Sequence, residues 1–327
     1  MGLAYRQKND EHFTKAGHLL GFDQLALCEQ EPELPVLKAV QNNDFSFEQC
    51  DTAVVINGKA FRYVFDKKIG NFSEMVYQNN TLIKKPIEYN IWRAPTDNDR
   101  NIRYRWQDAG FDRPIVKVYE AEASMKNGIV TIDFKLNLAP IYLQKILDIK
   151  GTWEVDTDGI AVIKIDCTKE MKMPFLPRFG LRLFMPKDFG EAEYFGYGPY
   201  ESYQDKRRAS YRGPFASKII DMHEDYIKPQ ENGSHYGCDF VSISKPGTTL
   251  KAVSSKRFCF NASVYTQEEL TNKLHNFELE ESEDTILCLD YAQSGIGSNS
   301  CGPELLEKHR FNEPEFRFEL ALIPSVN

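Results

Sequence analysis

Short turn signals between β-branched and aromatic runs constrain the fold of this chain more than any other feature. Asn57-Gly58 separates two such runs in TAVVINGKAFRYVF, and Asn127-Gly128 does so in ASMKNGIVTIDFKL. Asp158-Gly159 repeats the arrangement in WEVDTDGIAVIKID. Both central residues of a type I′ turn need positive φ, which Asn and Gly adopt at little cost. The pattern therefore predicts β-hairpins and an antiparallel, all-β sandwich.

Helical signals are few and do not alternate with the strands. A first helix is expected to end before Gly110, because glycine is the usual residue just past a helix. A second should begin after Thr266, which has a Glu three residues later, the capping-box spacing, and Leu270 and Leu274 share one of its faces. Pro303 fits the first position of a third. Without regular strand–helix alternation, a parallel α/β sheet is excluded.

Composition restricts the classes of function. The 327 residues are 42% hydrophobic and 13% aromatic, which is typical of a packed globular protein. The 48 acidic residues outnumber the 40 basic ones, so the net charge of −8 argues against nucleic-acid binding. No apolar run is long enough for a membrane span. The N-terminus has no apolar signal-peptide core, so a cytoplasmic location is expected.

Several common catalytic and metal-binding motifs are absent from the sequence. The seven cysteines form no CxxC and are expected to be small core residues in a reducing compartment, and the six histidines form no HExxH, so no metal site is expected. No GxSxG occurs. GIGSNSCG has Ser300 where a dinucleotide fingerprint needs glycine, so a tight turn lining a pocket is the better interpretation.

A domain boundary is indicated near EQEPELPVLK, where Pro32 and Pro35 interrupt the strand pattern. The segment before it, EHFTKAGHLLGFDQLALCEQ, looks like the last strand of a domain whose remainder is missing. Residues 1–36 are therefore assigned to the end of a preceding β-sandwich domain and a linker. Residues 37–327 are assigned to one large domain.

Three polar or aromatic stretches are candidates for a binding site. NIWRAPTDNDR follows an apolar segment and has the character of a loop that holds polar groups in place. In PQENGSHYG, Glu231, Asn232 and His235 could hydrogen-bond a sugar. Alternatively, Glu231 and Asn232 could cap the turn at Gly233, and the turn is favoured. YFGYGPYESYQDKR could stack on a pyranose or fill a core, and the core is the commoner use of such rings.

Taken together, these stretches resemble the C-terminal part of bacterial β-galactosidases of glycoside hydrolase family 2. WRAPTDNDR looks like the signature that opens the last domain of that family. GYGPYESYQDKR, PQENG, FNASVYTQEEL and GIGSNSCGP are similar to later motifs of the same domain, in the same order. AGHLLGFDQLAL is similar to the end of the immunoglobulin-like domain that precedes it.

The resemblance implies a large antiparallel β-supersandwich of the galactose-mutarotase type after a short immunoglobulin-like remnant. It also implies part of an enzyme that hydrolyses terminal β-D-galactosides by the retaining route, with both catalytic glutamates in a (β/α)8 barrel. This chain has no such barrel, so no catalytic residue is expected in it and the fragment alone should be inactive. No cofactor is expected in this chain, and any Mg²⁺ or Na⁺ of the intact enzyme would lie in the barrel domain.

The expected partners are a β-galactoside, a barrel-containing portion or large subunit, and further copies in an oligomer, with no nucleic acid and no membrane. Motif matching assigns residues to the rim of the substrate pocket: Asp97, Asn98, Asp99, Arg100, Asn299, Ser300 and Cys301. A second set is assigned to sugar contact or to structure: Tyr203, Asp205, Glu231, Asn232 and His235.

Some details of the rim follow from the resemblance and from local chemistry. Trp92 and Pro95 are expected to anchor the loop in the core, and Arg100 to pair with a neighbouring carboxylate. Asn101 stands where well-known members have a glycine, so loop opening is expected to differ. Cys301 aligns with a tryptophan that stacks on sugar in those members, which puts a preference for lactose in doubt.

Two other classes of function remain open from the sequence. A stand-alone aldose mutarotase or epimerase would need an acid–base pair in its own cleft, for which His235 and Glu231 are the nearest candidates. A non-catalytic carbohydrate-binding or assembly module would need neither.

Overall fold

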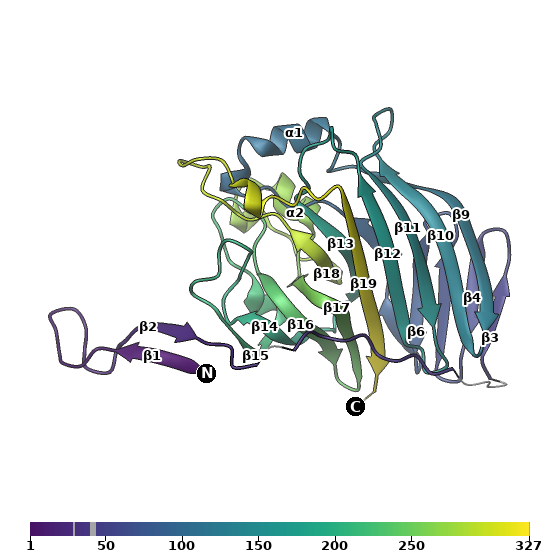
Figure 1. The fold of residues 1–327 in the computed structure, drawn as a ribbon, viewed down its shortest axis with the longest axis horizontal. Helices are drawn as coiled ribbons and strands as arrows, with labels where there is room; N and C mark the ends of the chain where they lie inside the picture. Colours follow the sequence, from purple (N-terminus) through teal and green to yellow (C-terminus); the bar gives the residue numbers. More distant parts are fainter. Residues whose placement is uncertain (29, 40–43, 327) are drawn as a thin grey trace. The chain divides into compact units, whose positions relative to one another are not determined.

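The computed structural model describes residues 1–28, 30–39 and 44–326, and these residues form an all-β chain (Figure 1). Every strand pair is antiparallel, as the hairpin signals predict. None of the helices in these ranges is long and apolar enough to cross a membrane.

The chain divides into two compact units, Met1–Glu31 and Pro32–Asn327. The first unit is a hairpin of β1 (Gly2–Arg6) and β2 (Leu19–Gln24). A two-stranded ribbon has little core of its own. The assignment of residues 1–36 to the end of a preceding domain and of 37–327 to one large domain stays a prediction.

The second unit is built around a twelve-stranded antiparallel sheet. Nine of its strands follow one another in the order β15 (Tyr211–Lys218), β14 (Glu191–Gly198), β16 (Ser234–Lys245), β17 (Thr248–Ser263), β19 (Glu315–Ser325), β12 (Ala161–Lys169), β11 (Leu147–Val155), β10 (Ile129–Ala139) and β9 (Ile115–Lys126). The other three branch from this path: β18 (Asp284–Gln293) pairs with β17 and with β13 (Arg178–Pro186), which pairs with β8 (Glu88–Asn90).

A five-stranded sheet forms the second layer. Its order is β3 (Ser46–Gln49), β4 (Ala53–Asn57), β5 (Phe61–Asp66), β6 (Asn71–Tyr77) and β7 (Asn80–Ile83). Aromatic rings join the two layers: the Phe72 and Trp153 centroids are 4.9 Å apart, and those of Phe65 and Phe134 are 6.2 Å apart. The main core therefore lies between this sheet and strands β10 and β11, which makes the unit a sandwich.

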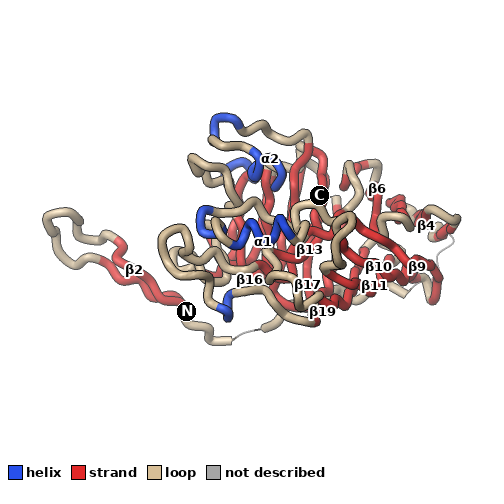
Figure 2. Tube along the Cα trace, turned by 90° about the horizontal axis from the view of Figure 1, so that it is seen from above, coloured by secondary structure: helices blue, strands red, loops and turns tan. Residues whose placement is uncertain are grey.

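Both α-helices lie near one end of the large sheet, α1 (Ile102–Asp108) above β13 and α2 (Gln267–Asn272) close by (Figures 1 and 2). Gly110, just past the C-cap residue Ala109 of α1, has a left-handed φ of +73°, as its position predicts. The Thr266 hydroxyl accepts from the backbone N–H of Glu269 at 3.0 Å, which confirms that cap. Short 3-10 turns cover Asp97–Asp99, Ile219–Met222, Asn276–Glu278 and Glu307–His309.

Two helical expectations are wrong. Leu274 does not share a helical face with Leu270, because α2 ends at Asn272 and Leu274 is 66% exposed. Pro303 begins no helix, since the first helical turn beyond it is the 3-10 turn at Glu307–His309.

The three predicted two-residue hairpin turns do not all form as expected. Asn127 (φ 54°) and Gly128 (φ 74°) form the expected two-residue turn between β9 and β10. Asn57-Gly58 does not, because Asn57 pairs with Arg62 inside the ladder. At Asp158-Gly159 the turn spans residues 156–160, with positive φ only at the glycine. Each of the three still joins two antiparallel neighbours.

The cysteine prediction is correct for part of the set. Four cysteines are buried as small core residues: Cys167, Cys238, Cys259 and Cys288. Three are exposed instead: Cys28, Cys50 and Cys301. None of the seven forms a disulfide.

We predict that Gln78→Asn stabilises the second unit by about 0.5–1 kcal/mol. Gln78 (φ 45°) and Asn79 (φ 63°) form a two-residue turn between β6 and β7. Asn adopts positive φ more readily than Gln, so the substitution should relieve strain. The measurement is the urea midpoint at constant m-value. Gln144→Asn, in an exposed loop, is the control, and a lower midpoint for Gln78→Asn would contradict the prediction.

Candidate functional site

The rim loop, residues 91–101, follows β8 and starts with buried side chains from Ile91 to Ala94. The Trp92 indole N–H donates to the Thr271 hydroxyl at 3.2 Å, and its ring meets Trp106 edge-on with centroids 6.4 Å apart. Trp92 therefore anchors the loop in the core as expected. Pro95 is only half-buried.

Arg93 clamps the rim loop onto a second segment, the rim turn, residues 294–302. Its guanidinium is fully buried and pairs with the Asp99 carboxylate through Nε–Oδ2 at 3.1 Å and Nη2–Oδ1 at 2.7 Å. It also donates to the carbonyls of Ser294 at 2.6 Å and Gly295 at 3.0 Å. Asp99 in turn accepts from the Thr96 backbone N–H at 2.9 Å. One guanidinium thus fixes both segments with a planar fork of donors.

The expected pairing of Arg100 with a carboxylate is wrong. Arg100 donates instead to the Ser300 carbonyl at 2.9 Å, and the neighbouring carboxylate of Asp99 is taken by Arg93. Burial alone would lower the pKa of Arg93, but the Asp99 carboxylate holds it above its ordinary value. The Arg93 guanidinium therefore stays charged.

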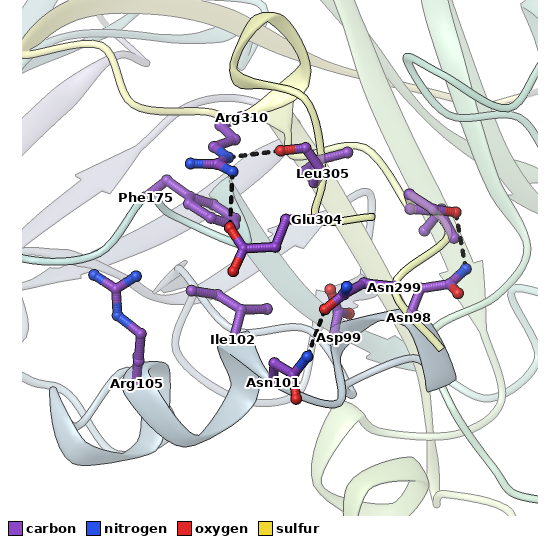
Figure 3. Close-up of a pocket in the computed structure, with 12 residues that line it drawn as sticks. Asn98, Asp99, Asn101, Ile102, Arg105, Phe175, Asn299, Glu304, Leu305 and Arg310 are labelled. Carbon is purple, nitrogen blue, oxygen red and sulfur yellow. Dashed lines mark hydrogen bonds and ion pairs between the residues drawn. The ribbon is translucent and has the colours of Figure 1, made fainter. Parts of the chain in front are cut away.

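Two asparagines tie the rim loop to the tip of the rim turn (Figure 3). Asn98 donates to the Gly297 carbonyl at 2.9 Å and accepts from the Ser300 backbone N–H at 3.1 Å. Asn101 donates to the Asn299 side-chain oxygen at 2.7 Å. The fold thus brings together two sets of predicted rim residues that lie about 200 positions apart in the chain.

Asp97 and Cys301 are at the edge of this contact. The Asp97 backbone N–H donates to Gln230 Oε1 at 2.9 Å, and Gln230 Nε2 reaches the Asp97 carboxylate at 3.3 Å. Cys301 is exposed, and its backbone N–H reaches the Ser298 carbonyl at 3.3 Å. Within the described residues, no hydrogen bond or ion pair joins either side chain to the other segment of the rim.

Asp205 holds the backbone of the rim turn by hydrogen bonds. Its two carboxylate oxygens accept the backbone N–H groups of Ile296 and Gly297, each at 2.8 Å. A Cβ at Gly295 would lie 2.6 Å from the same carboxylate, so the turn needs glycine there. This use of Asp205 favours the structural alternative over sugar contact.

Glu231 belongs to a buried ion network. Arg178 donates to Glu231 at 2.8 Å and to both oxygens of Asp290, at 3.1 and 2.5 Å. All three side chains are at most 2% exposed. Burial alone would lower the pKa of Arg178, but the two carboxylates hold it well above its ordinary value. Burial raises the pKa of Glu231, against the opposing effect of Arg178 and Arg93.

The remaining residues of the PQENG segment hold a turn, which is the interpretation that the sequence favours. The Asn232 side chain accepts from the Glu224 backbone N–H at 2.9 Å, and Gly233 has φ of +68°. The Gly233 N–H is capped by Glu201 at 3.0 Å, not by Glu231. Tyr203 is 2% exposed and packs as a core residue close to this network.

His235 is a core residue. Its ring lies 4.4 Å from Tyr194 and 5.1 Å from Phe260, measured between centroids. Nδ1 lies 3.0 Å from the Tyr197 carbonyl oxygen, so this nitrogen carries the proton of the neutral ring. Burial lowers the pKa of His235 to about 4. The imidazole has no contact with Glu231 in the described part of the chain, so the pair does not form an acid–base site.

A small pocket of about 80 Å³ opens between the rim loop and the rim turn (Figure 3). Its lining includes Asn98, Asn101, Ile102, Arg105, Phe175, Asn299, Glu304, Leu305 and Arg310. Pockets that bury a small ligand usually measure about 300–1,000 Å³. The rim alone is therefore too small a site for a hexose. The described residues hold no cluster of three or more His, Cys, Asp or Glu side chains suited to a metal ion.

A larger hollow of about 410 Å³ lies beside β8, with Arg182 in its wall. Arg182 is already bound by Glu88 at 2.5 Å and by Glu268 at 2.8 Å. Its guanidinium has little capacity left for a ligand, and none of the predicted rim residues lines this hollow. The rim remains the better candidate.

The contacts that Arg93, Asn101 and Gln230 make at the rim were not predicted from the sequence. Arg93 stands in the same motif as the predicted residues, and an arginine beside a buried tryptophan was the available signal. Gln230 precedes Glu231 directly, but nothing local distinguishes it from a solvent-facing glutamine.

Comparison with known proteins gives consistent matches. The family model described as "Beta galactosidase small chain" matches residues 57–322. The beta-galactosidase of Actinobacillus pleuropneumoniae is 38% identical over 323 residues, which cover 99% of this chain and 32% of that protein. The beta-galactosidase of Staphylococcus xylosus is 36% identical over 329 residues, covering 98% and 32%. The chain therefore spans about a third of the length of these relatives.

Among solved structures, a galactose 1-epimerase from Lactobacillus acidophilus NCFM aligns with a TM-score of 0.49 and 10% sequence identity. The alignment covers 89% of this chain and 100% of that one.

We predict that the burial of His235 makes stability depend on pH. Its pKa is about 4 when folded against an ordinary 6.5, so the unfolded state binds the proton more tightly between these values. The free energy of unfolding that the neutral, buried imidazole contributes is fully present above about pH 6.5. It is lost as the pH falls toward about 4, and the loss is about 2 kcal/mol at about pH 5. Urea midpoints of the wild-type chain and of His235→Phe at about pH 7.5 and about pH 5 measure this difference.

The expected result is a shallower pH dependence in His235→Phe than in the wild type. His12→Asn, at an exposed histidine, is the matched control. If the full wild-type dependence persists in His235→Phe, burial of this imidazole is not its cause.

Proposed function

Because the chain belongs to the beta-galactosidase small-chain family, we propose that it completes, from the side, the substrate pocket of a retaining β-galactosidase. The catalytic glutamates of that enzyme would lie in a barrel outside this chain. The proposed substrate is a terminal β-D-galactoside. The match of the family model over residues 57–322 carries this proposal.

The use of the carboxylates near the rim supports a non-catalytic role. A retaining glycosidase needs two facing carboxyl groups about 5 Å apart, one of them able to act as an acid. Asp99 and Glu231 are held in buried ion pairs, and Asp205 binds two backbone N–H groups. None of the three is free to attack a sugar or to protonate a leaving group.

The size of the rim pocket supports completion by another portion. At about 80 Å³ it cannot enclose a hexose, yet its two walls are fixed by buried interactions. A preorganised pocket that is too small by itself is what the proposal requires. The remaining two thirds of the relatives' length is the proposed source of the rest of the pocket and of the barrel.

Several finer points are also proposals. Exposed Cys301, in place of a stacking tryptophan, removes an apolar surface, so a β-galactoside other than lactose is a reasonable preferred substrate. Oligomer formation, Mg²⁺ or Na⁺ in the barrel portion, and a cytoplasmic location stay as expected from the sequence. The mutarotase alternative loses support because His235 and Glu231 are buried in separate contacts.

We expect this chain alone to have no activity on a chromogenic β-galactoside. Addition of the barrel-containing portion of the same enzyme should restore cleavage. The measurement is the rate of chromophore release by the chain, by the other portion and by the two together. Cleavage by the purified chain alone would overturn the proposal.

We expect Asn98→Ala in the complete enzyme to lower kcat/KM about tenfold, a loss of about 1.4 kcal/mol of transition-state stabilisation. The substitution removes the two hydrogen bonds that the Asn98 side chain makes to the rim turn. Steady-state kinetics measures the effect. Asp108→Asn, an exposed position near the end of α1, is the control. Unchanged kinetics for Asn98→Ala would count against a role of the rim at the pocket.

A further inference from the structure

Three large apolar side chains form an exposed group beside the rim. Ile227, Leu274 and Phe277, here called the apolar patch, are 78%, 66% and 81% exposed. They come from two segments that are held side by side, because the Asn276 backbone N–H donates to the Ile227 carbonyl at 2.9 Å. Single exposed apolar residues are common, but a group joined in this way usually marks an interaction surface.

The backbone beneath the apolar patch is ordered by polar contacts. Lys228 Nζ donates to the Lys273 carbonyl, and Asn276 donates to the Asp225 carboxylate at 3.0 Å. The Glu278 carboxylate accepts the backbone N–H groups of Leu274 at 2.8 Å and His275 at 3.0 Å. A surface that is already ordered loses little conformational freedom when it docks.

Phe277 is held in place by a second contact. Its ring stacks on that of His275, with centroids 5.2 Å apart and an interplanar angle of 12°. The phenyl ring is thus fixed in an outward position with most of its surface in water. Exposed aromatic anchors of this kind are typical of the centre of protein interfaces.

The apolar patch is continuous with the rim. Gln230, three positions after Ile227, accepts the Asp97 backbone N–H at 2.9 Å and donates to the Lys228 carbonyl at 3.3 Å. On the other side, Thr271, three positions before Leu274, accepts from Trp92 at 3.2 Å. The segments that carry the patch are therefore both bonded to the rim loop.

We propose that the apolar patch is the contact by which this chain binds the catalytic portion of its enzyme. This inference rests on the proposed function. The occupant follows from two observations: the relatives contain about twice as much further chain as this one supplies, and hydrogen bonds join the patch to the rim, whose pocket of about 80 Å³ is small for a hexose. Docking of the catalytic portion would cover the patch and place that portion against the segments bonded to the rim loop.

The test uses the full chain together with the remaining portion of the same enzyme, expressed as two chains. Binding is measured directly, by sedimentation or interferometry, and β-galactoside cleavage is measured separately. The double variant Ile227→Asp/Phe277→Asp replaces two apolar anchors by charges. Because both positions are largely exposed, the variant should keep the wild-type circular dichroism and thermal midpoint.

The control is Met125→Asp. Met125 is 37% exposed and lies near the far end of β9, roughly 33 Å along the strand from Ile115. We expect the double variant to weaken binding at least tenfold and the control to stay within about twofold of the wild type.

Each outcome of this experiment either supports or overturns the inference. Equal binding of the double variant and the wild type overturns the inference, as does a wild-type chain that does not bind the other portion. Loss of self-association alone would identify a second copy of this chain as the occupant and would also overturn it. Binding that depends on the patch but yields no cleavage supports the inference and removes the proposed function.

Discussion

The buried guanidinium of Arg93 is the interaction on which the candidate site depends. It is fully buried and makes four hydrogen bonds: two go to Asp99 and two to the carbonyls of Ser294 and Gly295. A buried charge is costly unless it is paired and hydrogen-bonded in this way. The rim loop and the rim turn can therefore move apart only by exposing or unpairing this charge.

A second buried arginine extends the same principle under the rim. Arg178 holds Glu231 and Asp290, and the Glu231 backbone N–H donates to the Ala94 carbonyl at 3.0 Å. The rim loop is thus linked to strands β13 and β18 through the chain that carries Glu231. Functional geometry that rests on paired buried charges is stiff, because each charge needs its partner in place. The residues that line the small pocket are therefore held in fixed positions.

The turn signals in the sequence predicted the antiparallel all-β fold, but they did not predict the strand register of every hairpin. A two-residue turn at Asn57-Gly58 would pair Ile56 with Lys59, whereas the observed register pairs Ile56 with Tyr63 and Val54 with Phe65. The observed pairing puts apolar residues opposite one another on the buried face, and that burial outweighs the local preference of Asn-Gly. At Asn127-Gly128 no such conflict arises, and the predicted turn forms.

The candidate site was predictable as a set of loops but not as a set of contacts. Motif matching found both segments of the rim, yet it chose Arg100 over Arg93 as the partner of a carboxylate. Ile91, Trp92, Arg93 and Ala94 are all buried, so the segment has no strand or helix period from which the direction of a side chain could be inferred. Only tertiary packing against Trp106, over which the Arg93 guanidinium lies at 5.5 Å, decides which arginine faces inward.

These buried ion pairs also limit the chemistry that the rim can contribute. A carboxylate that balances a buried arginine cannot also change its protonation during a reaction without leaving that charge unpaired. The stiffness of the rim and the engagement of Asp99, Glu231 and Asp205 are therefore one property, because the carboxylates that fix its shape are not available for catalysis. The amides of Asn98, Asn101 and Asn299, which line the pocket, can hydrogen-bond hydroxyls without transferring protons.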